Sequence, residues 1–292
     1  MAGDRNRNIA RDGGLLVGVL FAWAAFASGS TGARAEEGRA GPQGGSLVIC
    51  GGGGMPDRVR ARFVELAGGA NARILVVPTA SESADDPGPG LDEFLAPWRP
   101  FGPASVSLLH TRSRREADDP AFAAPVDEAT AIWFSGGDQS RITDAYLGTA
   151  VEAAFRRLLD RGGVIGGTSA GAAVMSRVMI TGGAEKATVG TGLGYLPGAV
   201  VDQHALRRSR LNRLLGVLAE HPDLAGVAVD ESTALIVDLK ARTWQVSGES
   251  YVVVCRTGGA VGAPVRIDVF HDREHGDLST WRAPDRVIES DR

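Results

Sequence analysis

Short apolar runs that end at glycines constrain the fold of this chain more than any other feature of its sequence. SLVIC at 46–50, AIWF at 131–134 and VI at 164–165 each lead, within one residue, into consecutive glycines. Segments with apolar residues at helical spacing, such as 59–66 and 151–159, lie between these runs. Buried strands that alternate with helices predict a doubly wound, mostly parallel α/β sheet with helices on both faces. The 40 glycines among 292 residues, about twice the usual share, are consistent with many tight turns.

The spacing of apolar residues changes late in the chain. The stretches 225–239, 243–247, 251–255 and 265–270 have the character of consecutive strands without long helices between them. We therefore expect a strand-rich C-terminal edge, mixed or antiparallel, on the same sheet. No internal repeat and no second domain is apparent, so residues 46–292 are predicted to form a single α/β domain.

The first 35 residues have the layout of a secretory signal peptide. Three arginines lie within residues 1–12, residues 14–28 are apolar and uncharged, and Ala33-Arg34-Ala35 has the form of a cleavage site. An uncleaved anchor is the alternative, but a run of about 15 apolar residues is shorter than the roughly 20 that span a bilayer. We expect residues 1–35 to be removed on export and residues 36–45 to be a flexible linker. The mature protein is then periplasmic or extracellular, and the sequence leaves both places open.

Charge and cysteine content narrow the possible functions. The formal charge is −4, or −6 without the first 35 residues, whereas binding to nucleic acid requires a basic face. No run after the signal peptide is long and apolar enough to span a membrane. Two cysteines, Cys50 and Cys255, cannot alone form a four-ligand zinc site, and the sequence indicates no metal and no cofactor. A disulfide between them and two buried free thiols both remain open.

The pentapeptide Gly167-Thr-Ser169-Ala-Gly171 has the pattern G-x-S-x-G and follows the apolar run 164–165. A sharp strand-to-helix turn at this place projects the Ser169 hydroxyl from the carboxyl edge of the sheet, and only small neighbours tolerate such a turn. The helix that follows supplies backbone N–H groups for a developing oxyanion. A glycine-rich turn with a capping serine is the alternative interpretation.

Two glycines at the end of another strand, Gly136 and Gly137, are candidates for further N–H donors to an oxyanion. Glycine allows the backbone amides to face a ligand closely. Gln139, which follows shortly after, is placed to orient a substrate. An ordinary loop is the alternative interpretation of this Gly-Gly turn.

A histidine followed by arginines forms a third candidate element. His204 comes after a short apolar run, so we expect it at a strand end, within reach of a serine at another strand end. Arginines follow at 207, 208, 210 and 213, and we expect them to crowd toward one side of a helix that starts just after His204. Clustered arginines on an acidic protein suggest bidentate binding of carboxylates. A solvated helix face is the alternative.

Two acids, Asp230 and Glu231, interrupt the apolar stretch 227–236. Acidic groups between buried strands are unfavourable unless they are paired, and a carboxylate that orients a catalytic imidazole is one such pairing. A turn at the edge of the sheet is the alternative. The order Ser169, His204, Glu231 nevertheless places a nucleophile, a base and an orienting carboxylate at the ends of separate strands.

Five motifs together resemble the cyanophycinase group of the S51 serine peptidases. They are GGGGMP (51–56), FSGGDQSRI (134–142), GGTSAGAAVMS (166–176), DQH with the arginines behind it (202–213) and DESTAL (230–235). The resemblance extends from about Leu47 to about Val254. It implies a fold similar to that of class I glutamine amidotransferases, with a serine on the elbow where those enzymes carry a cysteine. It also implies a homodimer.

The same resemblance implies a role for each candidate residue. Ser169 is then the nucleophile, His204 the general base and Glu231 the residue that orients His204. The remaining implied roles are an oxyanion hole formed by the amides of Ala170 and of Gly136 or Gly137, and a substrate pocket formed by Gln139, Asp202, Gln203, Arg208, Arg210 and Arg213.

Members of this group release β-Asp-Arg dipeptides from cyanophycin, a poly-aspartate backbone with arginine on each β-carboxyl. A pocket with acids and arginines suits this zwitterionic unit, since Asp202 can face a guanidinium and the arginines a carboxylate. Ala205 departs from the family pattern, which usually has an aromatic residue there. Two alternatives therefore stay open: an aspartyl dipeptidase-like S51 peptidase that acts on small acidic peptides, and a catalytically silent protein that binds an acidic ligand.

Overall fold

The structure, a computed structural model, describes residues 44–86, 89–259 and 262–281, and all of them belong to one compact unit. The predicted signal peptide, 1–35, lies outside the described residues. So does the predicted linker, 36–45, apart from its last two residues.

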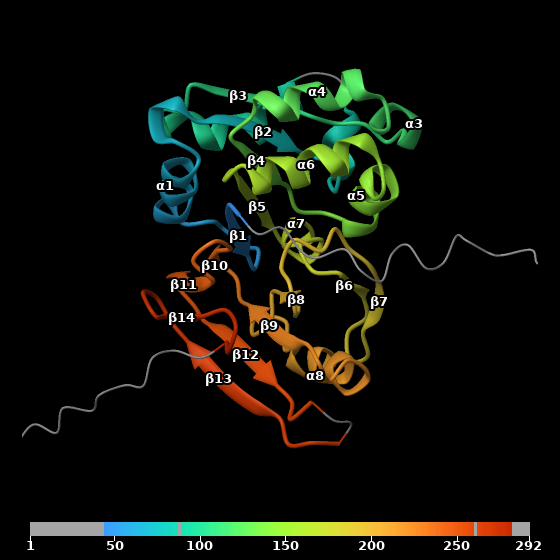
Figure 1. Cartoon of the computed structure of the whole chain (residues 1–292), viewed down its shortest axis with the longest axis vertical. Coiled ribbons are helices and arrows are strands. Elements are labelled where there is room, and N and C mark those ends of the chain that lie inside the picture. Colours follow the sequence, from blue (N-terminus) through green and yellow to red (C-terminus); the bar gives the residue numbers. More distant parts are fainter. Residues whose placement is uncertain (1–43, 87–88, 260–261, 282–292) are drawn as a thin grey trace, which may run out of the picture. The chain divides into compact units, whose positions relative to one another are not determined.

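A mixed eight-stranded sheet forms the centre of this unit (Figure 1). Its parallel part is hydrogen-bonded in the spatial order β1 (Ser46–Cys50), β5 (Val164–Thr168), β4 (Ala131–Phe134), β2 (Arg73–Val77) and β3 (Ser105–Leu108). On the other side of β1, the antiparallel strands are β10 (Thr233–Asp238), β11 (Thr243–Gly248) and β14 (His275–Asp277). The predicted α/β class, with a mostly parallel sheet and a strand-rich C-terminal edge, is confirmed.

Helices cover both faces of the main sheet. On one face lie α1 (Asp57–Leu66) and a 3₁₀ helix at Ala96–Phe101, which share a core with Val48 and Trp133. The helices on the opposite face are α4 (Pro120–Glu128), α5 (Gln139–Tyr146), α6 (Ala150–Asp160) and α7 (Ala170–Ala173). The short helices α2 (Asp92–Leu95) and α3 (Arg114–Ala117) lie in the connections before and after β3.

Several late strands leave the main sheet for a second one. Its order is β13 (Arg266–Phe270), β12 (Val252–Arg256), β9 (Ala225–Val229) and β8 (Ala199–Gln203), and α8 (Leu211–Glu220) packs on it. A separate ribbon consists of β6 (Val178–Gly182) and β7 (Thr188–Thr191). The apolar stretch predicted at 225–239 is therefore divided, because its first half lies in the second sheet and its second half in the main sheet.

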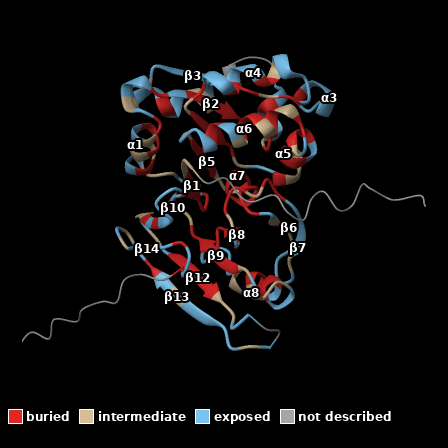
Figure 2. Cartoon of the chain, viewed as in Figure 1, coloured by how far each residue is buried: buried red, intermediate tan, exposed pale blue. Residues whose placement is uncertain are grey.

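Alternate residues of each central strand fill different cores, and Figure 2 shows these strands as the most buried part of the fold. Val48 points to the α1 side and Leu47 to the opposite side, as the period of two in a strand requires. On the α1 side Phe63, Trp98 and Trp133 form a cluster with ring centroids 4.8–5.1 Å apart. Such ring pairs add about 0.5–1.5 kcal/mol each beyond their buried area.

The carboxyl ends of β1, β5 and β4 lie next to one another. The register pairs Cys50 with Thr168 and Phe134 with Gly167, so the segments that follow these strands begin at one edge of the sheet. Open α/β sheets bind ligands at this edge.

Candidate active site

Ser169 lies on a sharp turn between β5 and α7. Its backbone angles, φ 53° and ψ −108°, are unusual for a residue with a side chain and are of the kind that costs about 1–3 kcal/mol. The flanking glycines permit the turn: a Cβ at Gly167 would be 2.5 Å from the Gly171 carbonyl oxygen, and one at Gly171 would be 2.4 Å from that of Phe134. The turn leaves Ser169 partly exposed at the sheet edge.

A continuous chain of hydrogen bonds joins Ser169 to His204 and Glu231. Ser169 Oγ is 2.9 Å from His204 Nε2, and His204 Nδ1 is 2.5 Å from Glu231 Oε1. His204 follows β8, and Glu231 lies where the chain crosses from β9 in the second sheet to β10 in the main sheet. The His204 side chain is 9% exposed and that of Glu231 28%. This is the geometry of a nucleophile, a base and a group that orients the base.

Burial lowers the pKa of His204 below its usual value, and the positive charges of Arg208 and Arg210 act in the same direction. The hydrogen bond to Glu231 opposes them without reversing the shift. The imidazole is therefore neutral near pH 7, as a general base has to be. When Nε2 accepts the Ser169 hydroxyl, Nδ1 carries the ring hydrogen and donates it to Glu231.

Three successive carbonyl groups, one at the end of β1 and two in the glycine turn after it, hold the backbone at or next to these three residues in place. The carbonyl oxygens of 50–52 accept, in order, the N–H groups of Ser169 at 3.0 Å, His204 at 2.7 Å and Ser232 at 2.9 Å. These carbonyls thus fix the backbone of Ser169, of His204 and of the residue next to Glu231. Sequence reasoning placed these glycines at the correct edge of the sheet but assigned them no role.

Gly52 and Gly53 also make room for the two other side chains. A Cβ on Gly52 would be 2.2 Å from His204 Cε1, and one on Gly53 would be 2.9 Å from Glu231 Cβ. Both glycines have positive φ angles, of 107° and 68°. The available signal was a run of four glycines directly after a buried strand, which is more than a turn alone requires.

Asp230, which sequence reasoning noticed but left without a role, fixes the turn that follows His204. Its buried carboxylate accepts the N–H groups of Leu206 at 3.0 Å and Arg207 at 2.8 Å, and also the Ser250 hydroxyl at 2.8 Å. The first of the two acids therefore supports the turn after His204, while the second contacts the imidazole itself.

The predicted oxyanion donors lie beside Ser169. A Cβ on Gly136 would be 3.6 Å from Ser169 Cβ, and Ala170 is the first residue of α7. Among the residues that the structure describes, none accepts a hydrogen bond from the backbone N–H of Gly136, Gly137 or Ala170. Backbone N–H groups without protein acceptors in the segments beside Ser169 are suited to binding negative charge.

The predicted row of arginines on one helix face is wrong. Residues 204–209 form a turn in which His204 and Ser209 both have positive φ angles, so α8 begins only at Leu211. Arg213, on α8, turns inward and pairs with Asp202, with Nε 2.8 Å from Oδ2. The two side chains are only 3% and 1% exposed, so they bind each other and do not face solvent.

The other predicted pocket residues lie at the end of β8, in the turn after it or at the start of α5. Arg210 donates to the Gln203 side chain at 2.9 Å, and Arg208 is exposed in the turn beside His204. Gln139 uses its side-chain nitrogen to hold β6, by donating to the carbonyls of Ile180 at 2.7 Å and Thr181 at 3.0 Å.

Both cysteines are buried free thiols, which decides the alternative that the sequence left open. Burial raises the pKa of Cys50 to about 12 and that of Cys255 to about 11, so neither is a reactive thiolate. Within the described ranges, no group of three or more His, Cys, Asp or Glu side chains is placed to hold a metal ion.

The fold and the serine site together define a serine-type peptidase built on the class I glutamine amidotransferase-like fold. The model of peptidase family S51 matches residues 47–242. The chain belongs to this family and, within it, to the cyanophycinase group.

Two curated relatives illustrate this membership. The chain is 34% identical over 221 residues to a cyanophycinase of Geminocystis herdmanii, covering 71% of this chain and 79% of that protein. It is 36% identical over 215 residues to a cyanophycinase of Synechococcus elongatus, covering 69% of this chain and 66% of that protein. A solved peptidase from an acI-B1 Actinobacterium is similar in fold, with a TM-score of 0.64 at 23% identity over 80% of this chain and 96% of that one.

Proposed function

We propose that this peptidase cleaves the backbone peptide bonds of cyanophycin and releases β-Asp-Arg dipeptides. The observation that carries the proposal is the unbroken series of hydrogen bonds from Ser169 through His204 to Glu231. The substrate follows from the curated relatives, which are cyanophycinases.

In the proposed mechanism His204 Nε2 takes the proton of Ser169 as Oγ attacks the carbonyl carbon of an aspartyl peptide bond. Glu231 holds the imidazole in the required tautomer and stabilises its charged form. His204 then gives the proton to the leaving nitrogen, the C–N bond breaks, and an ester to Ser169 remains. Water, deprotonated by His204, attacks this ester, and as the bond to Ser169 Oγ breaks, His204 returns the proton to that oxygen and the acid is released.

The negative charge of the tetrahedral intermediates develops on the former carbonyl oxygen. We assign its binding to the N–H groups of Ala170 and of Gly136 or Gly137, which have no other acceptor among the described residues. Fixed donors of this kind contribute more than any other single term in many enzymes of acyl transfer.

The positive charge of Arg208 near His204 supports the proposal that the substrate carries an acidic group at this place. Arg208 is exposed and close enough to His204 to lower its pKa, so it is the guanidinium that we propose binds a substrate carboxylate. We propose that Arg210 and Gln203, which are hydrogen-bonded to each other, line the substrate site next to Arg208. Asp202 and Arg213 support this site from the interior rather than by touching the substrate.

Ala205, where the chain departs from the family pattern, lies in the core and not at the surface. Ala205 is 1% exposed and packs with Leu214 and Leu218 of α8. Since its side chain points into the core, the missing aromatic ring does not count against a polymer substrate.

Incubation of the protein with insoluble cyanophycin tests the proposal. We expect soluble β-Asp-Arg, labelling of one serine by a fluorophosphonate, and loss of both in Ser169→Ala with no change in folding. Ser140→Ala, on the neighbouring helix α5, is the matched control and should keep both. Product formation by Ser169→Ala would contradict the mechanism. Release of aspartate from small acidic peptides, without attack on cyanophycin, would instead identify a dipeptidase.

We also propose that the protein is exported after cleavage near residue 35. None of the helices in the described part of the chain is long and apolar enough to cross a membrane. N-terminal sequencing of protein from the periplasm and from the medium tests this proposal. A protein that retains Met1 and stays with the cells would contradict it.

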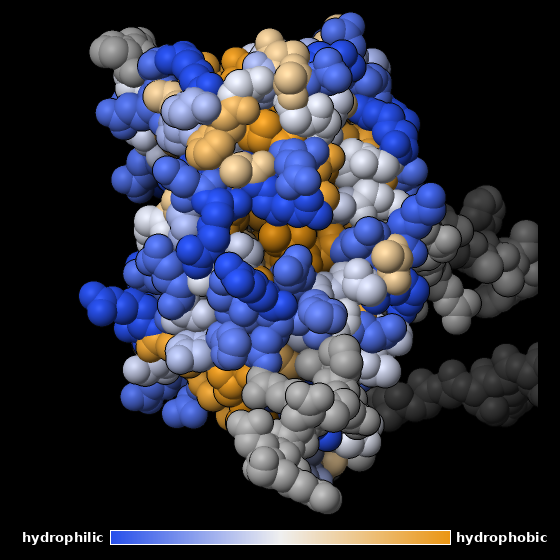
Figure 3. Space-filling model, turned by 90° about the vertical axis from the view of Figure 1, so that its left-hand side faces the viewer, coloured by the Kyte–Doolittle hydropathy of each residue, from blue (hydrophilic) through white to orange (hydrophobic). Residues whose placement is uncertain are grey.

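A homodimer is the last element of the proposal, and β13 is the surface that supports it. This strand is the edge of the second sheet, and Ile267 and Val269 on it, with Val265 directly before it, are exposed. Figure 3 shows an apolar patch near the lower end of the face that it draws. Antiparallel self-pairing about Ile267 places Arg266 opposite the partner subunit's Asp268, so charges of opposite sign meet. Light scattering should give a dimer, and Ile267→Lys should give a monomer; a monomeric wild-type protein would contradict the proposal.

A further inference from the structure

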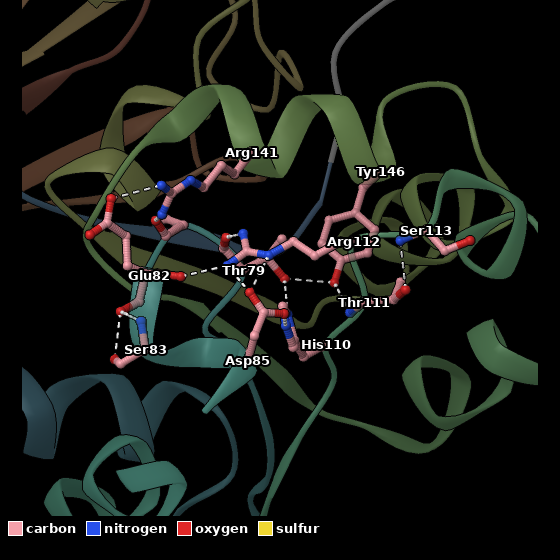
Figure 4. A network of polar contacts seen from close by, with 12 residues as sticks. Thr79, Glu82, Ser83, Asp85, His110, Thr111, Arg112, Ser113, Arg141 and Tyr146 are labelled. Atoms are coloured by element: carbon pink, nitrogen blue, oxygen red, sulfur yellow. Dashed lines mark hydrogen bonds and ion pairs between the residues drawn. The ribbon is translucent and has the colours of Figure 1, made fainter. Parts of the chain in front are cut away.

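A polar network outside the proposed triad holds the loop that follows β2 (Figure 4). Arg112, from the loop after β3, reaches this segment with all three guanidinium nitrogens. Its Nη1 donates to the Thr79 carbonyl, its Nη2 to the Ser81 carbonyl at 2.7 Å, and its Nε to Asp85 Oδ2 at 2.9 Å. One planar guanidinium thus fixes two backbone carbonyls and a carboxylate of one loop.

Arg141, on α5, reaches the same loop from another direction. Its Nη1 lies 3.4 Å from the Ala80 carbonyl oxygen, and its Nη2 donates to Glu82 Oε1 at 2.9 Å. The two arginines together engage three successive carbonyls, those of 79–81. Exposed ion pairs contribute only about 0–1 kcal/mol to stability, so the main consequence of these contacts is the position in which they hold this backbone segment.

A second layer of hydrogen bonds supports the loop from within. His110 Nδ1 is 2.9 Å from Thr79 Oγ1, and His110 Nε2 is 3.0 Å from Asp85 Oδ1. Thr79 Oγ1 is also 2.8 Å from the Tyr146 hydroxyl, which is fully buried. Hydrogen bonds from Arg112 and His110 hold the pKa of Asp85 below its usual value, so this carboxylate stays charged.

The loop at 79–81 packs directly against the Gly136–Gly137 turn. The Asp138 N–H donates to the Ala80 carbonyl at 2.9 Å, and a Cβ on Gly137 would be 2.1 Å from that same oxygen. On its other side the turn lies against Ser169, with 3.6 Å between a Cβ on Gly136 and Ser169 Cβ. The turn is therefore enclosed between the loop at 79–81 and the serine.

We infer that Arg112 and Arg141 are positioning residues for the oxyanion hole, which they align through the backbone of 79–81. Neither side chain touches the reacting atoms. The inference rests on the proposed function, because it needs the Gly136–Gly137 turn to bind the oxyanion. Without the guanidinium groups the loop at 79–81 is free to move away from the Gly136–Gly137 turn. The N–H groups of this turn then no longer point at the place where the oxyanion forms.

Steady-state kinetics of Arg112→Ala and Arg141→Ala on soluble cyanophycin test the inference, with active sites counted by fluorophosphonate labelling. Loss of a whole oxyanion donor lowers kcat about 10²–10³-fold, so a displaced donor should lower kcat per active site about 10–100-fold. KM should stay within about twofold, because the oxyanion exists only after attack. Free guanidinium at low millimolar concentration should restore part of the kcat of Arg112→Ala.

Arg157→Ala is the matched control, since Arg157 makes a similar bidentate contact with Asp127 on the far helices α4 and α6. It should leave kcat and KM unchanged and should not respond to guanidinium. An unchanged kcat per active site in Arg112→Ala, or a loss explained wholly by fewer folded molecules, would overturn the inference. A wild-type protein that neither cleaves cyanophycin nor takes the label would instead refute the proposed function.

Discussion

Gly52 is the position at which a single added methyl group should separate His204 from Ser169. In Gly52→Ala the new Cβ would lie 2.2 Å from His204 Cε1 and 2.5 Å from Nε2. Carbon atoms in contact are normally about 3.5–4.0 Å apart. The imidazole therefore has to retreat by about 1.3 Å or more, or the backbone of the turn has to move.

Either movement breaks the hydrogen bond to Ser169. Ser169 Oγ and His204 Nε2 are 2.9 Å apart now, and a shift of about 1.3 Å leaves them too far apart to bond. Because a displacement of about 1 Å costs on the order of 10²-fold in rate, we expect kcat on cyanophycin to fall at least about 100-fold. The φ of 107° at Gly52 adds strain, which should lower the free energy of unfolding by about 1–3 kcal/mol.

Turnover of cyanophycin, the rate of serine labelling and thermal unfolding measure these effects. Gly54→Ala is the matched control in the same turn, because a Cβ there meets nothing within 4 Å. It should be as active and as stable as the wild type. A folded Gly52→Ala protein with wild-type kcat would show that activity does not depend on the space that this glycine leaves for His204.

Further predictions concern charge. Arg208→Gln removes a positive charge that lowers the pKa of His204. The pKa of His204 should therefore rise, and the acidic limb of the kcat/KM–pH profile should move to higher pH. A shift of this limb to lower pH would contradict the prediction. Arg213→Ala leaves the Asp202 carboxylate buried without its partner and should lower the free energy of unfolding in urea by about 3–5 kcal/mol. A decrease in the free energy of unfolding below about 1 kcal/mol, as expected for an exposed pair, would show that solvent reaches the Asp202 carboxylate in the variant.

The fold was predictable from local patterns to a large extent. Apolar runs followed by glycines, such as 46–50 and 131–134, indicated buried strands, and the helical spacing between them indicated a parallel sheet. Both signals are local, because strand and helix periodicity arise from backbone geometry within a few residues. The division of 225–239 between two sheets was not predicted. The two acids in the three-residue crossing at 230–232 interrupt the apolar pattern, but such an interruption does not tell which sheet the next strand joins.

The arginine cluster shows where local reasoning failed. A spacing of three residues indicated a helix face, but positive φ angles at His204 and Ser209 keep the chain in a turn until 211. Whether an arginine faces solvent or a buried carboxylate depends on the partner across the interior. For Arg213 that partner is Asp202, which lies on the neighbouring strand β8.

The sequence by itself determined which residue types could do chemistry and at which strand ends they lie, because a G-x-S-x-G turn and a strand-terminal histidine are local features. Only the tertiary structure decided that Ser169, His204 and Glu231 are hydrogen-bonded to one another. Their spacing depends on how two sheets pack and on the carbonyls of 50–52, which hold the backbone at Ser169, at His204 and next to Glu231. Such contacts join residues far apart in the chain, so no sequence period encodes them.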